Sequence, residues 1–81
     1  MERYEKMLTS LGMTITKREK TAGGLDIVTA EKETPRGTLS IYCGANGTAR
    51  VDKPNGTHKW YYEKTVGQIR AALVQTIEFN R

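Results

Sequence analysis

The sequence predicts an α+β fold, in which an antiparallel β-meander of four to five strands is flanked by an N-terminal and a C-terminal helix packed on one face. The expected order is αβββββα or αββββα. Apolar residues recur at helical spacing near both ends of the chain, stretches of alternating polarity fill the middle, and glycine-containing turns separate these stretches. With 81 residues, the chain is long enough for one small domain, so residues 1–81 are predicted to fold as a single unit.

The first element is predicted to be a helix that begins near Glu2. Its apolar residues have the i, i+3, i+4, i+7 spacing of one buried stripe, and they are Tyr4, Met7, Leu8 and Leu11. Gly12 follows, and glycine is common just beyond a helix because it tolerates left-handed backbone. The helix is therefore expected to end near Leu11 and to bury this stripe in the core.

Two strands are expected next, over residues 13–20 and 25–32. The first contains a Thr-Ile-Thr run typical of strands, and residues 21–24 end in two adjacent glycines that can form a turn. Residues 33–37 hold a proline and a glycine, which break the pattern. These two strands are therefore expected to pair as a hairpin.

The clearest strand pattern runs from Thr38 to Cys43, where apolar and polar residues alternate. Two further strands are expected over residues 48–53 and 57–62. A closing helix begins after Thr65, which forms a capping box with Gln68 three residues later. The apolar face of this last helix begins at Val66. The predicted core combines the first helix stripe with two strand residues and three residues of that face, namely Ile41, Val51, Ile69, Leu73 and Ile77.

The turns at residues 44–48 and 53–57 share the sequence x-x-Asn-Gly-Thr. An Asn-Gly pair suits either a two-residue hairpin loop or a type I turn that ends in a left-handed glycine. For the first turn, a two-residue loop would mix apolar and charged residues on one face. A three-residue loop instead pairs Ile41 with Val51 and leaves Tyr42 opposite Arg50 on the other face. We therefore expect three-residue loops, with Gly47 and Gly56 at positive φ.

The second turn leaves two orientations open. The same three-residue geometry places Lys59 and Tyr61 on the core face and Trp60 outward, which would bury a lysine. Another loop length or a bulge sends Trp60 and Tyr62 inward instead. Because so small a core is short of large side chains, we expect Trp60 inside and Lys59 and Tyr61 on the open face. Either orientation leaves an aromatic side chain on that face.

The formal net charge is +4, and most of the excess lies in the middle of the chain, where residues 34–64 carry a net +3. A basic patch attracts polyanions, although the same charge also serves solubility. The single cysteine, Cys43, excludes an internal disulfide and a multi-cysteine zinc site, and its alternation places it in the core. No apolar stretch is long enough for a membrane span or a signal peptide, so a cytoplasmic location is expected, with no membrane partner, metal or cofactor.

The residues do not favour an enzyme. In the three-residue register Ser40, Asp52 and His58 line up across three strands, which is the composition of a hydrolase triad. A flat sheet face, however, supplies neither oxyanion donors nor a substrate pocket, so a polar cross-strand row is the preferred interpretation. The paired glycines precede a strand rather than a helix, which argues against a phosphate-binding loop.

The predicted order is similar to the helix, three strands and helix of double-stranded RNA-binding domains. That family carries a Gly-Pro-x-His loop and a lysine-rich start to its second helix. Here the corresponding features are the Gly-Thr-His of residues 56–58 and Lys64 alone. The resemblance is therefore one of topology, and no family is assigned from it.

Nucleic-acid binding through a basic and aromatic open sheet face is the leading functional hypothesis, because rings can stack on bases and cations can contact phosphates. The candidate binding residues are Tyr42, Arg50, Lys53, Lys59, Tyr61 and Lys64. The alternative is a binding module of the phage or mobile-element type, which inhibits or adapts a host protein such as a CRISPR effector nuclease. An exposed sheet edge could also pair two copies as a homodimer.

Overall fold

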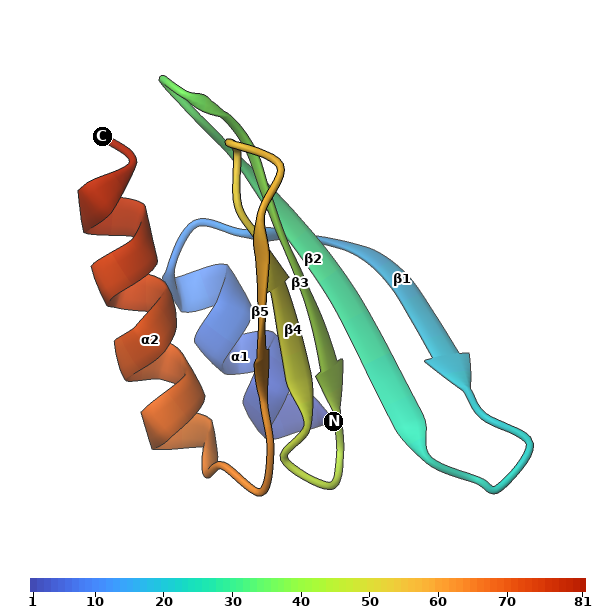
Figure 1. The fold of residues 1–81 in the computed structure, drawn as a ribbon. Coiled ribbons are helices and arrows are strands. Elements are labelled where there is room, and N and C mark those ends of the chain that lie inside the picture. Colours follow the sequence, from blue (N-terminus) through green and yellow to red (C-terminus); the bar gives the residue numbers. More distant parts are fainter.

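The computed structural model describes residues 1–81 and contains five strands and two helices (Figure 1). In chain order the elements are α1 (Glu2–Ser10), β1 (Thr14–Lys20), β2 (Asp26–Thr34), β3 (Gly37–Gly44), β4 (Ala49–Asp52), β5 (His58–Tyr61) and α2 (Val66–Phe79). The strands form one sheet in sequence order, and every neighbouring pair is antiparallel. The predicted α+β meander is thus confirmed with five strands. Neither helix has the length and apolarity required to cross a lipid bilayer.

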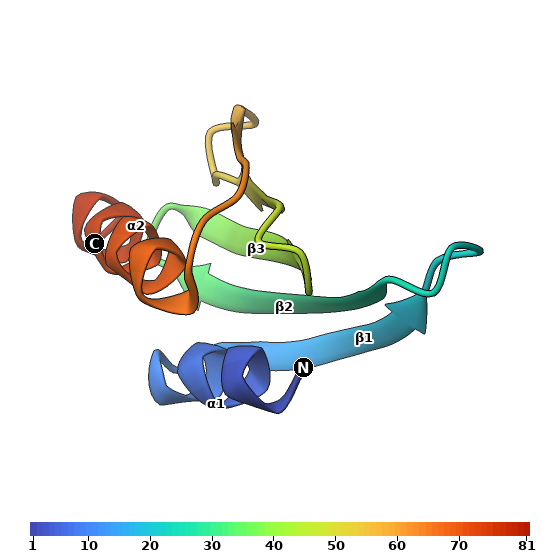
Figure 2. The same cartoon turned by 90° about the horizontal axis from the view of Figure 1, so that it is seen from below.

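Both helices pack on the same face of the sheet and leave the other face open (Figure 2). Side chains alternate between the two faces of a strand, so one set of alternate residues is buried beneath the helices. The predicted Tyr4, Leu11, Val66 and Ile77 are partly buried and pack against this core. The core itself consists of Met7, Leu8, Met13, Val28, Ala30, Leu39, Ile41, Cys43, Ala49, Val51, Ile69 and Leu73.

The C-terminal end of α1 and the N-terminal end of α2 have the structures that the sequence predicts. After α1, Gly12 has φ +79°, the left-handed conformation expected beyond a helix. Before α2, the Thr65 hydroxyl accepts a hydrogen bond from the Gln68 amide at 3.1 Å. The Gln68 side chain in turn accepts from the Thr65 amide at 3.0 Å. This is the predicted capping box.

The two Asn-Gly-Thr turns have the same geometry. In each, the asparagine side chain accepts a hydrogen bond from the threonine amide at 3.1 Å. Gly47 and Gly56 have φ values of +83° and +87°, so both predicted left-handed glycines are confirmed. The first turn brings Ile41 opposite Val51 and Tyr42 opposite Arg50, as expected from the polarity pattern.

The expected inward orientation of Trp60 is wrong. The second turn repeats the first, so Trp60 lies opposite Arg50 on the open face and Lys59 lies opposite Val51 on the helix side. β5 is the edge strand of the sheet, and Lys59 there remains exposed. The lysine therefore keeps its hydration, and the burial cost that favoured the opposite register does not arise.

A register shift between Ile15 and Lys17 changes the side on which later β1 residues lie. Ile15 lies opposite Ala30 and Arg18 lies opposite Val28, both on the helix side. Arg18 Nη2 and Nε donate to Glu5 Oε1 of α1 at 2.7 and 2.9 Å. The bulge thus lets one guanidinium connect β1 to the first helix.

Candidate nucleic-acid interface

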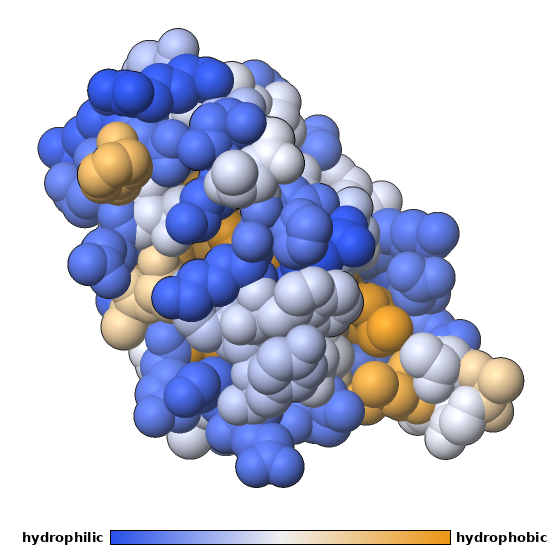
Figure 3. All heavy atoms as spheres, in the orientation of Figure 1, coloured by the Kyte–Doolittle hydropathy of each residue, from blue (hydrophilic) through white to orange (hydrophobic).

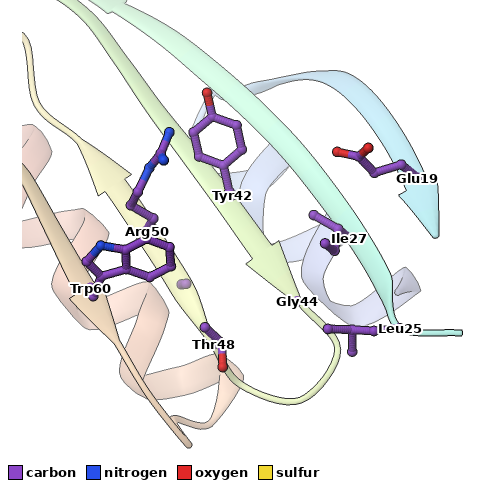
Figure 4. A pocket seen from close by; sticks show the side chains of 9 residues that line it. Glu19, Leu25, Ile27, Tyr42, Gly44, Thr48, Arg50 and Trp60 are labelled. Atoms are coloured by element: carbon purple, nitrogen blue, oxygen red, sulfur yellow. The ribbon is translucent and has the colours of Figure 1, made fainter. Parts of the chain in front are cut away.

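Three neighbouring strands place an arginine between two aromatic rings on the open face (Figure 4). The guanidinium carbon of Arg50 on β4 lies 4.4 Å from the ring centroid of Tyr42 on β3 and 5.7 Å from that of Trp60 on β5. Tyr62, just past β5, stacks on Trp60 with centroids 6.1 Å apart and ring planes 10° apart. We call these four residues the aromatic row.

The aromatic row is accessible because no helix covers this face. Trp60 is 47% exposed and Tyr62 is 62% exposed, high values for such large side chains. A pair of parallel exposed rings offers flat apolar faces together with polar edges. The outer end of the aromatic row is therefore available for stacking with a ligand.

The Arg50 guanidinium is held in place by a carboxylate and by the two rings beside it. Arg50 Nη2 donates to Asp52 Oδ2 at 2.9 Å, and this hydrogen bond raises the pKa of Arg50 above its usual value. Arg50 Nε is buried and has no protein hydrogen-bond partner. Carboxylate and rings together restrict the side chain, so it presents a permanent positive charge in a defined place.

Beside the aromatic row lies a hollow of about 250 Å³. Leu25 and Ile27 of the first hairpin border one side, and the rings of Tyr42 and Trp60 border the other (Figure 4). A Cβ placed on Gly44 would lie 3.0 Å from Asn46 Oδ1 and 3.5 Å from Leu25 Cδ2, so a side chain here would press on the β3–β4 turn and on the wall of the hollow. We did not predict the hollow, because Gly44 lies just past the predicted Thr38–Cys43 strand and within the turn expected over residues 44–48.

The structure divides the predicted site residues among three places. Tyr42 and Arg50 lie on the open face as expected, but Lys59 and Tyr61 lie on the helix side, where Trp60 and Tyr62 were expected. Lys53, Lys59 and Tyr61 line a groove of about 270 Å³ between the β4–β5 hairpin and α2. Lys64 is exposed in the connection to α2.

The groove also contains a residue that we did not single out, Phe79, which is 81% exposed. The apolar stripe of α2 runs through Ile69, Leu73 and Ile77, and its spacing continues to the buried Asn80. Phe79 lies outside this stripe, so the helical spacing alone predicts that its side chain is exposed. The face that carries α2 and β5 is otherwise mostly hydrophilic (Figure 3).

The expected Ser40, Asp52 and His58 row forms in register across β3, β4 and β5. Asp52 nevertheless accepts its hydrogen bond from Arg50, and no hydrogen bond joins the three members of the row. No three histidine, cysteine, aspartate or glutamate side chains lie together in a way that could hold a metal ion. The row thus has the contacts of a polar sheet surface.

Fold and surface together define a small α+β protein with an open sheet face that carries exposed aromatic rings around a fixed arginine. Comparison with known proteins found no matching family model, no matching curated protein and no matching solved structure. Its function is therefore inferred from the chain's own geometry.

Proposed function

We propose that the protein binds single-stranded nucleic acid through the aromatic row. The observation that carries this proposal is the stacked, exposed pair Trp60 and Tyr62 next to the held guanidinium of Arg50. Unpaired bases stack on aromatic rings and on guanidinium planes, and each stacked base contributes about 1 to 3 kcal/mol. Arg50, which pairs with Asp52, adds a third flat group beside the two rings of Tyr42 and Trp60.

Single strands suit this surface better than duplexes. Bases within a duplex already stack on each other and present only their edges, whereas the aromatic row offers ring faces. Duplex readers usually insert a helix or a β-ribbon into a groove. In this protein both helices contribute to the core through buried residues, and the open face belongs to a five-stranded sheet.

The proposal is tested by titrating the protein with oligothymidylate and oligouridylate of about ten nucleotides, and with matched duplexes, at two salt concentrations. Trp60 is the only tryptophan, so its fluorescence reports directly on the site. We expect quenching by the single strands, weaker binding of the duplexes, and affinity that falls steeply as salt rises because counterions are released.

Two variants and a control make the titration specific to the site. Tyr62→Ala removes the more exposed ring of the stacked pair and should weaken binding by about 1 to 3 kcal/mol. Arg50→Ala should weaken binding to all sequences. Arg3→Ala removes an exposed arginine of α1 that makes no ion pair, and it should bind like the parent protein. Equal losses in Arg50→Ala and Arg3→Ala would argue against the site.

The same surface suggests a second candidate function, which is to bind a protein partner. β5 is an edge strand, and tryptophan, tyrosine and arginine are the residues that most often dominate protein interfaces. A host protein bound by an inhibitor or adaptor would meet these side chains first. Absence of binding to every oligonucleotide at low salt, with a stoichiometric protein partner that survives nuclease treatment, would reject nucleic-acid binding and favour this candidate.

A further inference from the structure

We propose that the bound strand runs along the free edge of β5, with its bases on the aromatic row and its phosphates against Lys53, Lys59 and Lys64. We call these three residues the lysine track. This inference rests on the proposed function and adds the path of the ligand. It also assigns a role in binding to Lys53 and Lys59, which lie on the helix side of the hairpin and not on the open face with Arg50.

The edge position of β5 makes such a path feasible. β5 pairs only with β4, so no strand lies beyond it. Successive side chains point to opposite faces, which puts Trp60 on the open face and Lys59 on the helix side. A ligand that follows the outer edge can therefore contact rings on one face and an ammonium group on the other.

The lysine track carries charge that no carboxylate of the protein neutralises. In the N-terminal half, three lysines form ion pairs, Lys6 with Glu2, Lys17 with Glu19 and Lys20 with Asp26, and only Lys32 forms none. Lys53, Lys59 and Lys64 form none, and the Lys59 ammonium lies over the Tyr61 ring, 5.3 Å from its centroid. A phosphate could approach without breaking an internal ion pair.

The alternative path across the sheet offers no unpaired cation. In the register of the aromatic row, a strand crossing from β5 toward β1 would meet Thr29 of β2 and Lys17 of β1, and Lys17 already pairs with Glu19. The next outward residue of β2 beyond Thr29 is Glu31, which forms no ion pair and would repel a phosphate. The unpaired lysines along β5 thus favour the edge path.

The test compares two triple variants with the same loss of charge and the same chemistry. Lys53→Gln, Lys59→Gln and Lys64→Gln together remove the lysine track. Lys6→Gln, Lys17→Gln and Lys20→Gln together remove three lysines of α1 and of β1, the opposite edge of the sheet. For each protein the association constant for a single-stranded oligothymidylate is measured against salt concentration by Trp60 fluorescence.

For the lysine-track variant we expect the slope of log K against log salt to shrink by about 2, because each phosphate contact on a single strand contributes about 0.7. The quenching amplitude at saturating oligonucleotide and low salt should stay that of the parent protein, because stacking on Trp60 is retained. The control variant should keep the parent slope.

An unchanged slope in the lysine-track variant, or an equal change in both variants, would overturn the edge path while leaving stacking intact. Failure of the proposed function looks different. In that case the parent protein itself shows no Trp60 quenching and no binding.

Discussion

Gly47 packs directly against the backbone of Lys64. The Lys64 amide donates a hydrogen bond to the Gly47 carbonyl oxygen at 3.1 Å. A Cβ placed on Gly47 would lie 2.5 Å from the Lys64 carbonyl oxygen and 2.9 Å from its nitrogen. This contact joins the β3–β4 turn to the connection between β5 and α2, so it helps to position Tyr62 and Lys64 at the proposed site.

Alanine at Gly47 should therefore be far more harmful than alanine at Gly56. Both glycines have positive φ, but no atom lies within 4 Å of the position of a Cβ on Gly56. Gly56→Ala should cost about 1 to 2 kcal/mol for the left-handed backbone alone. In Gly47→Ala the new Cβ also collides with the Lys64 backbone, and such overpacking costs a further ~1 to 3 kcal/mol. Urea unfolding of the two variants measures the difference, and equal losses would contradict the contact.

Leu73→Ala should destabilise the protein by about 2 to 5 kcal/mol, because Leu73 is fully buried where α2 meets the core and its removal leaves a cavity. Gln75→Ala is the matched control on the same helix, since this side chain is exposed and should change stability by less than about 0.5 kcal/mol. Chemical denaturation measures both. A midpoint unchanged by Leu73→Ala would remove this residue from the core.

The contact between α1 and β1 should make stability depend on acid pH. The hydrogen bonds from Arg18 lower the pKa of Glu5 below its ordinary 4.5. This contribution is therefore fully present above that ordinary pKa and is lost as pH falls through the lowered one. Glu5→Gln should flatten this part of a denaturation-midpoint profile measured from pH 6 downward.

Glu2→Gln is the control for this pH profile, because Glu2 pairs only with the exposed Lys6, at 3.5 Å, and not with an arginine of the sheet. Its profile should follow that of the parent protein. A Glu5→Gln profile indistinguishable from the parent would show that the Arg18 contact does not form in solution.

Cys43 should be unreactive while the protein is folded. Burial raises the pKa of this thiol to about 12, so the reactive thiolate is nearly absent at neutral pH, and the sulfur is also shielded from reagents. Labelling by a thiol-specific disulfide reagent should therefore follow unfolding and accelerate in urea and in Leu73→Ala. Immediate labelling of the native protein would place Cys43 outside the core.

Local patterns in the sequence determined the elements of this fold and the chemistry of its turns. Helical spacing identifies Met7, Leu8, Ile69 and Leu73 as core residues, because a helix buries residues three and four apart on one face. The Asn-Gly-Thr repeat predicts two left-handed glycines, since the cause lies within each turn itself. The placement of Tyr42 and Arg50 on the open face follows from strand alternation and one turn length.

Only the tertiary structure decided which way the last strand faces. The cost of placing Lys59 on the helix side depends on whether another element encloses it, and no local pattern states that β5 is the sheet edge. Trp60 therefore joins Arg50 on the open face, against the sequence-based expectation. The hollow over Gly44 and the contact of Gly47 with Lys64 likewise depend on segments distant in sequence, because each arises from how the turns and hairpins pack in space.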